Sequence, residues 1–230
     1  MKITWLGQAG LLFVKENNGF CVMIDPYLSN SVVKYEPQND RRVPVNEEFL
    51  KITPDVLIFT HDHLDHYDPE TAPHFLHKTD KRMTVLAPSS VCKKARAEGG
   101  GHNYVQFNRH TSWTEGQLRF TAVKAEHSEE YAIGVLIEDL SESKTYYVTG
   151  DTLYSSEIFG DLPDAIDVIF LPINGVGNNM NMTDAARFAA ETGASAVVPI
   201  HFGMFDSLNP ADFACANRVI PEIWKEIQLS

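Results

Sequence analysis

The residue types best suited to chemistry gather in one short run of this sequence. Residues 61–66 read His-Asp-His-Leu-Asp-His and follow the largely apolar residues 55–60. In extended backbone, side chains two positions apart point to the same side, so His61 and His63 can reach one cation. Asp65 and His66 follow at once and can face a second cation. Because imidazoles and carboxylates crowded at the end of a buried strand are costly to bury alone, the run predicts a metal site.

Three further ligand candidates come from distant parts of the chain. His127, Asp151 and His201 each follow a segment that we predict to be a strand. Side chains at the ends of strands are held by a rigid scaffold, as a metal site requires. Neutral imidazole and carboxylate suit Zn²⁺ and Mn²⁺ alike. Taken alone, each of these residues has an ordinary alternative. Asp151, for example, could simply cap a following helix.

A weaker group of residues could support the site or contact a substrate. Asp25 and Asp62 are candidates for acceptors that orient ligand imidazoles, although Asp62 fits a turn carboxylate nearly as well. Asn174 could position a substrate, or Asn174-Gly175 could be only a turn. A phosphate group on the substrate would need a cation, for which the candidates are Lys34, Arg41 and Arg109, residue types that more often lie on the surface.

The elements expected to position these residues alternate between strands and helices. We expect strands over residues 2–6, 10–14, 20–24, 55–60, 83–87, 104–107, 118–125, 132–138, 145–149, 168–172 and 196–200. We expect helices over residues 46–51, 69–78, 89–98, 154–159, 183–191 and 210–227, with a loop over 29–44. Strands followed by helices in both halves predict two sheets packed face to face with helices outside. No linker is visible, so residues 1–230 are expected to form one domain.

Composition and charge limit the kinds of partner that we expect for this protein. The formal net charge is -12, which would repel a phosphate backbone and argues against nucleic acid. No segment carries the ~20 consecutive apolar residues of a membrane helix, and no signal peptide is visible. The three cysteines, Cys21, Cys92 and Cys215, are too few and too far apart for a disulfide framework. We therefore expect a cytoplasmic protein that does not enter membranes.

The order of the ligand candidates carries a family resemblance. The series His61-x-His63-x-Asp65-His66, His127, Asp151 and His201 resembles the metallo-β-lactamase superfamily across nearly the whole chain, as do Ile24-Asp25-Pro26 and Gly150-Asp151-Thr152. The resemblance implies an α/β fold, a four-layer αββα sandwich of two mixed β-sheets flanked by helices. It also implies two metal ions, the first held by His61, His63 and His127, the second by Asp65, His66 and His201, with Asp151 bridging them.

One subgroup is similar in further segments. Residues 171–175, 177–178, 181–183, 199–205 and 209–213 are similar to the L-ascorbate-6-phosphate lactonases, although this chain is shorter than those enzymes. This likeness implies Mn²⁺ and the opening of a lactone ring, whereas the general affinity order of divalent metals favours Zn²⁺.

These observations together predict a metal-dependent hydrolase of small molecules. Two cations lower the pKa of water from ~15.7 towards neutrality, which supplies a nucleophile without a serine or cysteine. Asp65 and Asp151 are the expected catalytic carboxylates. The expected substrate is a lactone, ester or phosphoester, with a phosphorylated sugar lactone as one candidate, and a homo-oligomer is compatible with the sequence. The alternatives are a nuclease of the same fold, acting on RNA or another phosphodiester, and a metal-binding protein without turnover.

Overall fold

Two six-stranded sheets form the body of the protein. The computed structural model describes residues 1–229, so that only Ser230 of the expected domain lies outside the described residues. The first sheet has the order β1 (Lys2–Gly7), β2 (Gly10–Val14), β3 (Cys21–Ile24), β4 (Val56–Ile58), β5 (Thr84–Ala87) and β6 (Asn103–Gln106). The second has the order β12 (Ala196–Ile200), β11 (Val168–Pro172), β10 (Lys144–Val148), β9 (Ile133–Asp139), β8 (Leu118–Lys124) and β7 (Ser112–Glu115).

Both sheets are mixed, and they are built alike. In the first sheet, β1, β2 and β3 pair antiparallel, and β3, β4, β5 and β6 pair parallel. In the second sheet, β7, β8, β9 and β10 pair antiparallel, and β10, β11 and β12 pair parallel. Parallel strands need long crossovers, and the loops and helices of those crossovers supply the residues around the site.

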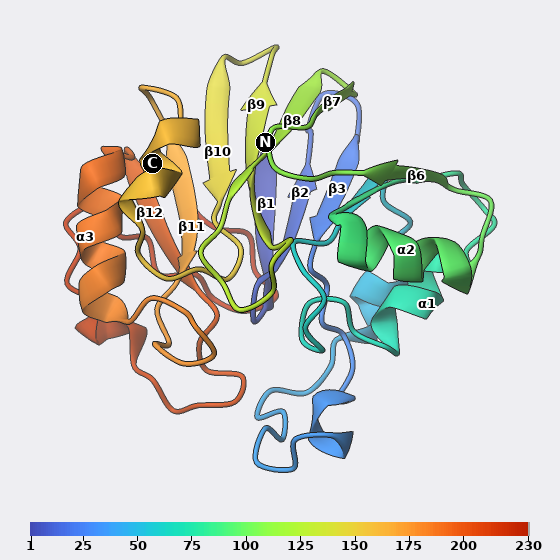
Figure 1. Cartoon of the computed structure of the whole chain (residues 1–230), viewed down its shortest axis with the longest axis horizontal. Coiled ribbons are helices and arrows are strands. Elements are labelled where there is room, and N and C mark those ends of the chain that lie inside the picture. The colour runs from blue at the N-terminus through green and yellow to red at the C-terminus, as the bar shows by residue number, and fades with distance from the viewer. Residues whose placement is uncertain (230) are drawn as a thin grey trace.

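Helices cover the outer faces of both sheets (Figure 1). Helices α1 (Thr71–Leu76) and α2 (Ser89–Glu98) lie on the side of the first sheet, and α3 (Met182–Thr192) lies on the side of the second. The described residues also form four short 3₁₀ helices: η1 (Val32–Lys34), η2 (Glu47–Lys51), η3 (Ser156–Asp161) and η4 (Pro210–Asp212). The predicted αββα sandwich of two mixed sheets is confirmed. No helix within residues 1–229 is long and apolar enough to cross a membrane.

Strand β3 shows how the sequence builds two cores at once. Val22 and Ile24 pack between the two sheets, whereas Cys21 and Met23 pack towards α1 and α2. All four side chains are buried, because successive residues of a strand point to opposite faces and each face of this sheet is covered. An apolar run without polar alternation is the expected sequence of such a strand.

The predicted helix over residues 210–227 is wrong. Only η4 is helical there, and the chain then runs along the edges of both sheets. Val219 N donates to Val197 O of β12 at 2.8 Å, and Ile227 N donates to Ile3 O of β1 at 2.8 Å. Edge strands offer unpaired backbone groups, and Pro221 interrupts any helix, so pairing with the sheets prevails over local helical propensity.

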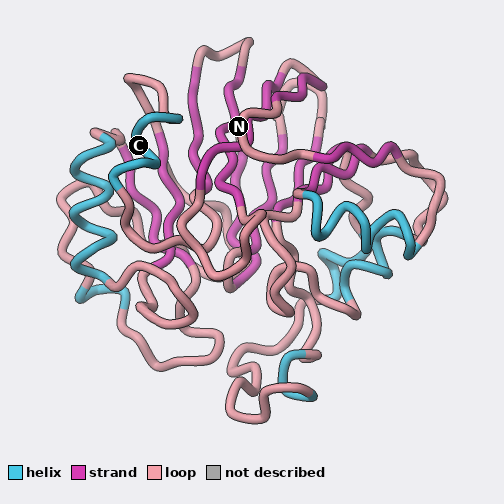
Figure 2. Tube along the Cα trace, in the orientation of Figure 1, coloured by secondary structure: helices cyan, strands magenta, loops and turns pink. Residues whose placement is uncertain are grey.

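Smaller differences from the predictions are local. Residues 154–159 are not an α-helix, because that region forms η3 instead, and the strand β7 was not predicted at all. The predicted cap of the helix at 46–51 is confirmed, since the Asn46 side chain accepts a hydrogen bond from Glu48 N, although the helix is 3₁₀. The loop over residues 29–44 contains η1. Figure 2 shows that the longest loops gather at one end of the strands.

Candidate metal centre

The run 61–66 begins in extended backbone and then turns. His61 follows β4 and is fully buried, and the chain folds back where His66 N and Tyr67 N both donate to His63 O, at 3.0 and 2.9 Å. The turn returns Asp65 and His66 to the side where His61 and His63 lie. One six-residue segment therefore contributes to two neighbouring clusters.

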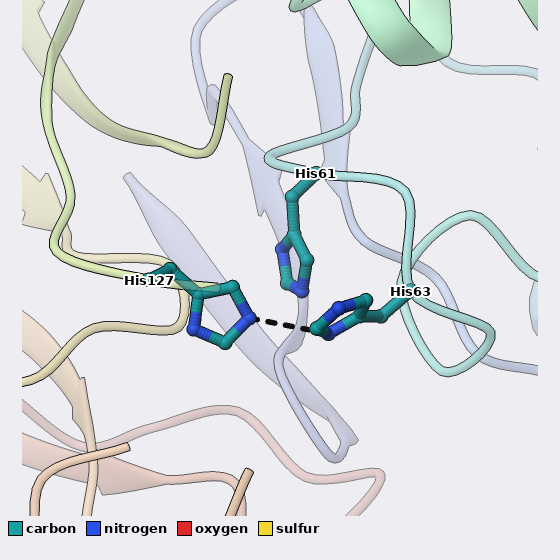
Figure 3. A group of neighbouring side chains, drawn as sticks. All are labelled: His61, His63 and His127. Carbon is teal, nitrogen blue, oxygen red and sulfur yellow. Dashed lines mark hydrogen bonds between the residues drawn. The ribbon is translucent and has the colours of Figure 1, made fainter. Parts of the chain in front are cut away.

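The first cluster consists of His61, His63 and His127. His127 Nε2 lies 3.1 Å from His63 Nδ1, and the ring centroids of His61 and His127 are 4.6 Å apart. The three rings converge on one point, although His127 comes from a loop between β8 and β9 (Figure 3). The ligand atoms of the three residues lie within 4.8 Å of one another.

The second cluster consists of Asp65, His66 and His201. His201 Nε2 lies 3.3 Å from Asp65 Oδ2 and 3.4 Å from His66 Nε2. His201 follows β12, at the edge of the second sheet, whereas Asp65 and His66 follow β4 of the first sheet. The second cluster thus joins the two sheets, and its ligand atoms also lie within 4.8 Å of one another.

Asp151 lies between the clusters. Its Oδ1 is 3.3 Å from His66 Nε2, its Oδ2 is 3.2 Å from His201 Nε2, and it also groups with His61 and His66. The preceding Gly150 has a φ of +63°, and a Cβ there would lie 2.6 Å from Ile133 O. Only glycine fits that backbone without displacing the carboxylate that follows.

Electrostatics divides the imidazoles into two kinds. Burial lowers the pKa of His61 and of His127, so both are neutral rings with a free lone pair. Burial would also lower the pKa of His66 and His201, but the carboxylates of Asp151 and Asp65 raise both, that of His201 to about 10. The carboxylates at the second cluster are therefore stabilised by positive charge beside them, which protons on the imidazoles or a cation can supply.

The donor set fits divalent metal ions. His61 Nε2 is buried and has no hydrogen-bond partner, although it points towards His63 and His127 (Figure 3). An orphaned buried imidazole nitrogen is costly unless something binds it, and imidazole and carboxylate are ligands that Zn²⁺ and Mn²⁺ accept. The structure brings together all seven predicted ligands, in groups that match the division implied by the family resemblance.

The weaker candidates have different fates. Asp25 Oδ2 accepts from His66 Nδ1 at 2.8 Å, the position of an acceptor that orients a ligand. Asp62 instead pairs with Lys94 Nζ at 2.7 Å and orients no imidazole in the structure. Asn174 lies beside the site, with Nδ2 at 3.1 Å from His201 Nδ1. The predicted phosphate contacts have other partners: Lys34 pairs with Glu70, Arg41 donates to backbone carbonyls through Nε and Nη1, and Arg109 pairs with Asp161.

Two amide side chains near the metal ligands were missed by the sequence analysis. Gln8 Nε2 donates to Asp65 Oδ2 at 2.8 Å, and Asn179 Nδ2 donates to Asp151 Oδ2 at 2.7 Å. Both amides are buried. The only signal for Gln8 is a polar residue directly after an apolar strand, the same signal that marked His127 and His201.

Three residues at the site have a strained backbone conformation. Gln8, Asp25 and His201 have φ values of +49°, +42° and +58°, a region that side chains other than glycine rarely adopt. Each such residue costs about 1–3 kcal/mol and persists where the surroundings impose it. All three lie just after strands at the site, where the two sheets hold them in place.

Comparisons with known proteins show which family and fold the chain resembles. The sequence model of a family described as "Beta-lactamase superfamily domain" matches residues 21–202. A UPF0173 protein of Pyrococcus furiosus is 29% identical over 215 residues, covering 93% of this chain and 89% of its own. A UPF0173 metal-dependent hydrolase of Exiguobacterium is 31% identical over 225 residues, covering 89% and 87%. The solved structure of Igni18, a metallo hydrolase of Ignicoccus hospitalis, is similar with a TM-score of 0.78 at 19% identity, covering 100% and 98%.

Proposed function

We propose that this chain, a metal-dependent hydrolase that belongs to the beta-lactamase superfamily, hydrolyses lactones or esters of small metabolites with two divalent metal ions. The observation that carries the proposal is the pair of ligand clusters joined by Asp151. His61, His63 and His127 would hold one ion, and Asp65, His66 and His201 the other. Ions held there supply Lewis acidity at a carbonyl oxygen and an activated water at neutral pH.

The protein's own residues fix the protonation of the ligands. Asp25 Oδ2 accepts the Nδ1 proton of His66, so a metal ion would displace only the proton on Nε2, which faces Asp151 and His201. The Asn178 carbonyl oxygen lies 3.3 Å from His127 Nδ1 and holds that ring in the same way. These acceptors select one tautomer and orient each ring, so the site is ordered before a ligand arrives.

Asn174 performs the same task for His201. Its Oδ1 is buried and without a partner, while its Nδ2 lies 3.1 Å from His201 Nδ1. The oxygen and nitrogen of an amide have nearly the same shape, so a half-turn of the Asn174 amide exchanges their positions. Oδ1 then accepts the Nδ1 proton of His201, and Nδ2 is left as a donor. Asn174 also lines the cleft beside the ligands, so this donor is available to a substrate.

Asp65 and Asp151 are the proposed catalytic carboxylates. Both line the cleft. Burial opposes their charge, but His66 and His201 keep the pKa of both well below the ordinary range of a carboxyl, so both are ionised. Two ionised carboxylates at these positions would help to hold the metal ions beside the reacting carbonyl. We propose an ester or lactone as substrate because the hydrolysis of either needs no catalytic group on the protein beyond those named above.

The metal and the location are parts of the same proposal. Histidine and aspartate ligands without cysteine suit Zn²⁺ and Mn²⁺. The likeness to the L-ascorbate-6-phosphate lactonases favours Mn²⁺, and elemental analysis of protein purified without added metal distinguishes the two. The three cysteines are free, which supports the proposed cytoplasmic location.

The test combines two ligand variants with one control. We expect Asp65→Ala and Asp151→Ala each to abolish hydrolysis across a panel of lactones and carboxylic esters. Asp62→Ala removes a neighbouring carboxylate that pairs with Lys94 and should keep the activity. Metal content is measured on all three proteins. Hydrolysis that survives in both ligand variants refutes the proposed function.

A further inference from the structure

The cleft beside the ligand clusters has a volume of about 650 Å³. Its walls come from six places: the residue after β1, the flap segment (residues 29–44), the turn after β4, and the loops after β10, β11 and β12. The ligands occupy one part of this space. The remaining walls face whatever part of a substrate lies away from the scissile bond, so their charge and polarity select its chemical class.

No lysine or arginine lines this cleft within residues 1–229. In the nearby flap segment, Lys34 and Arg41 have partners outside the cleft, and Arg42 does not line it. Lys34 pairs with Glu70, and Arg41 Nη1 donates to Tyr27 O at 2.7 Å while its Nε donates to Val43 O at 2.7 Å. Arg109, on the second sheet's side, pairs with Asp161 at 2.6 and 2.8 Å. The cationic side chains with which proteins usually bind a phosphate are therefore missing from the lining of the cleft.

The walls carry negative charge instead. Besides Asp65 and Asp151, the cleft is lined by Glu36, Asp62 and Asp206. Lys94 compensates Asp62, but Glu36 accepts only from the neutral Asn39 Nδ2 at 2.6 Å. Asp206 Oδ1 accepts from Gly203 N and Leu208 N, both at 2.9 Å, and no cationic side chain contacts it among the described residues. Two carboxylates thus remain without a counter-charge on the walls away from the ligands.

Apolar side chains supply the rest of the contact surface. Val32, Leu64 and Phe205 line the cleft and belong to one apolar cluster that also contains Tyr27 and Met204. Val176 lines it from the loop after β11 and is 62% exposed, which is high for a large apolar residue. A substrate with an apolar portion would cover these side chains.

We propose that the substrate is an ester or lactone whose body is uncharged and partly apolar, and that Glu36 and Asp206 exclude phosphorylated analogues. This inference rests on the proposed function. A phosphate dianion placed against two carboxylates is repelled by each, and at the effective dielectric of a cleft such a repulsion corresponds to at least about a tenfold loss in kcat/KM. The flap segment thus contributes to substrate specificity, because it places Glu36 in the wall of the cleft.

The experiment compares substrates that differ only in the phosphate. Gluconolactone and its 6-phosphate are assayed with the metal-loaded enzyme, together with an apolar lactone of similar ring size. We expect kcat/KM to be at least about tenfold higher for the two uncharged lactones than for the phosphate. We expect Glu36→Gln to narrow this ratio severalfold. Glu47→Gln removes an equal charge at an exposed position outside the cleft and should leave the ratio unchanged.

The outcomes separate the two proposals. If the phosphorylated lactone is the better substrate, or if the ratio responds equally to Glu36→Gln and Glu47→Gln, the inference on charge is overturned while the hydrolase function stands. If the enzyme hydrolyses no ester or lactone with any metal, the proposed function fails and this inference fails with it.

Discussion

Strands β2 and β9 connect two groups of buried charge that differ in one respect. β2 begins near Gln8 at the metal centre and ends at Val14, directly before Lys15. β9 begins where Ile133 N donates to Thr60 O, next to His61, and ends at Asp139. The ligand clusters thus lie at one end of these strands, and an ion pair of Lys15 and Asp139 lies at the other.

At the Lys15 end, every charge has its partners. Lys15 Nζ donates to both oxygens of Asp139 at 2.8 Å and to Ser141 Oγ at 2.6 Å. Asp139 also accepts from Ser141 N and Glu142 N, at 3.0 and 3.2 Å. Both charged side chains are buried, and the pair links the first sheet to the second.

At the other end, the charges are incomplete. Asp25, Asp65 and Asp151 share the rings of His66 and His201, and His61 Nε2 has no partner. Both ends bury charge between the same two sheets, but only the Lys15 end satisfies it with the protein's own atoms. The difference teaches that buried charge by itself does not mark a functional site, whereas buried charge that lacks a partner does.

The largest expected effect is on activity. Asp151→Asn should reduce kcat/KM by at least about 10³-fold, because several kcal/mol of electrostatic stabilisation depend on the ligand set. Asp139→Asn makes the same chemical change at the Lys15 end and should leave kcat/KM of the folded enzyme within about twofold. Steady-state assays on protein of known folded fraction check both. Comparable losses in the two variants would contradict the comparison.

The next effect is on stability. Lys15→Met leaves the Asp139 carboxylate buried without a counter-charge and should lower the free energy of unfolding by about 3–5 kcal/mol. The double variant Lys15→Met/Asp139→Leu should recover most of the loss, because no charge is then left unpaired. Urea unfolding measures both. If Lys15→Met is as stable as the double variant, Lys15 and Asp139 do not depend on each other for their charge compensation.

A smaller effect is expected on metal affinity. Asp25→Asn weakens the acceptor of His66 Nδ1 and should lower the affinity of the second cluster for metal by about 10–100-fold. Asp62→Asn is the control, since Asp62 pairs with Lys94 instead of an imidazole. Competition with a chromogenic chelator measures the affinities. Equal affinities in the two variants would remove Asp25 from the support of the site.

The smallest effect is a dependence of stability on pH. Burial opposes the charge of Asp139, but hydrogen bonds from Lys15 and Ser141 bring the pKa of its carboxyl below the ordinary value. The group therefore contributes stability above pH ~3.9, its unfolded pKa, and the contribution is lost as the pH falls through the folded pKa.

The advantage of the parent over Asp139→Asn should thus be full at pH 6 and shrink below about pH 4. Denaturant unfolding at several pH values measures this difference. Asp164→Asn, a change at an exposed carboxylate, should show no such trend. An advantage that stays constant down to pH 2 would rule out the assigned role of the carboxylate.

Local sequence was sufficient for the parts of the protein that depend on local rules. The apolar runs predicted most strands, and the superfamily inferred from the order of the ligand candidates between His61 and His201 is confirmed. The likeness to lactonases stays a prediction. Gln8 and Asn179 were missed because an amide has no distinctive spacing, and its role is visible only when Asp65 and Asp151 lie beside it.

The errors arose where distant segments decide. The segment 210–227 was predicted helical because helical propensity contains no information on the open edges of β1 and β12, which lie far away in sequence. Asp62 and Arg41 were weaker candidates for the site because of their neighbours in the chain, but Lys94 and the carbonyl of Tyr27 are their partners in space. Partners of long polar side chains are set by the fold rather than by local sequence.

The pairing of residues 217–227 with β12 and β1 has a consequence for the behaviour of the protein at high concentration. An uncovered edge strand is a template on which another chain can add a strand, and such additions lead to aggregation. The C-terminal segment occupies an edge of each sheet at once, through Val219 and Ile227. Shortened chains that end before residue 217 would expose both edges together, and we expect them to form aggregates even where the metal ligands, which all precede that point, are intact.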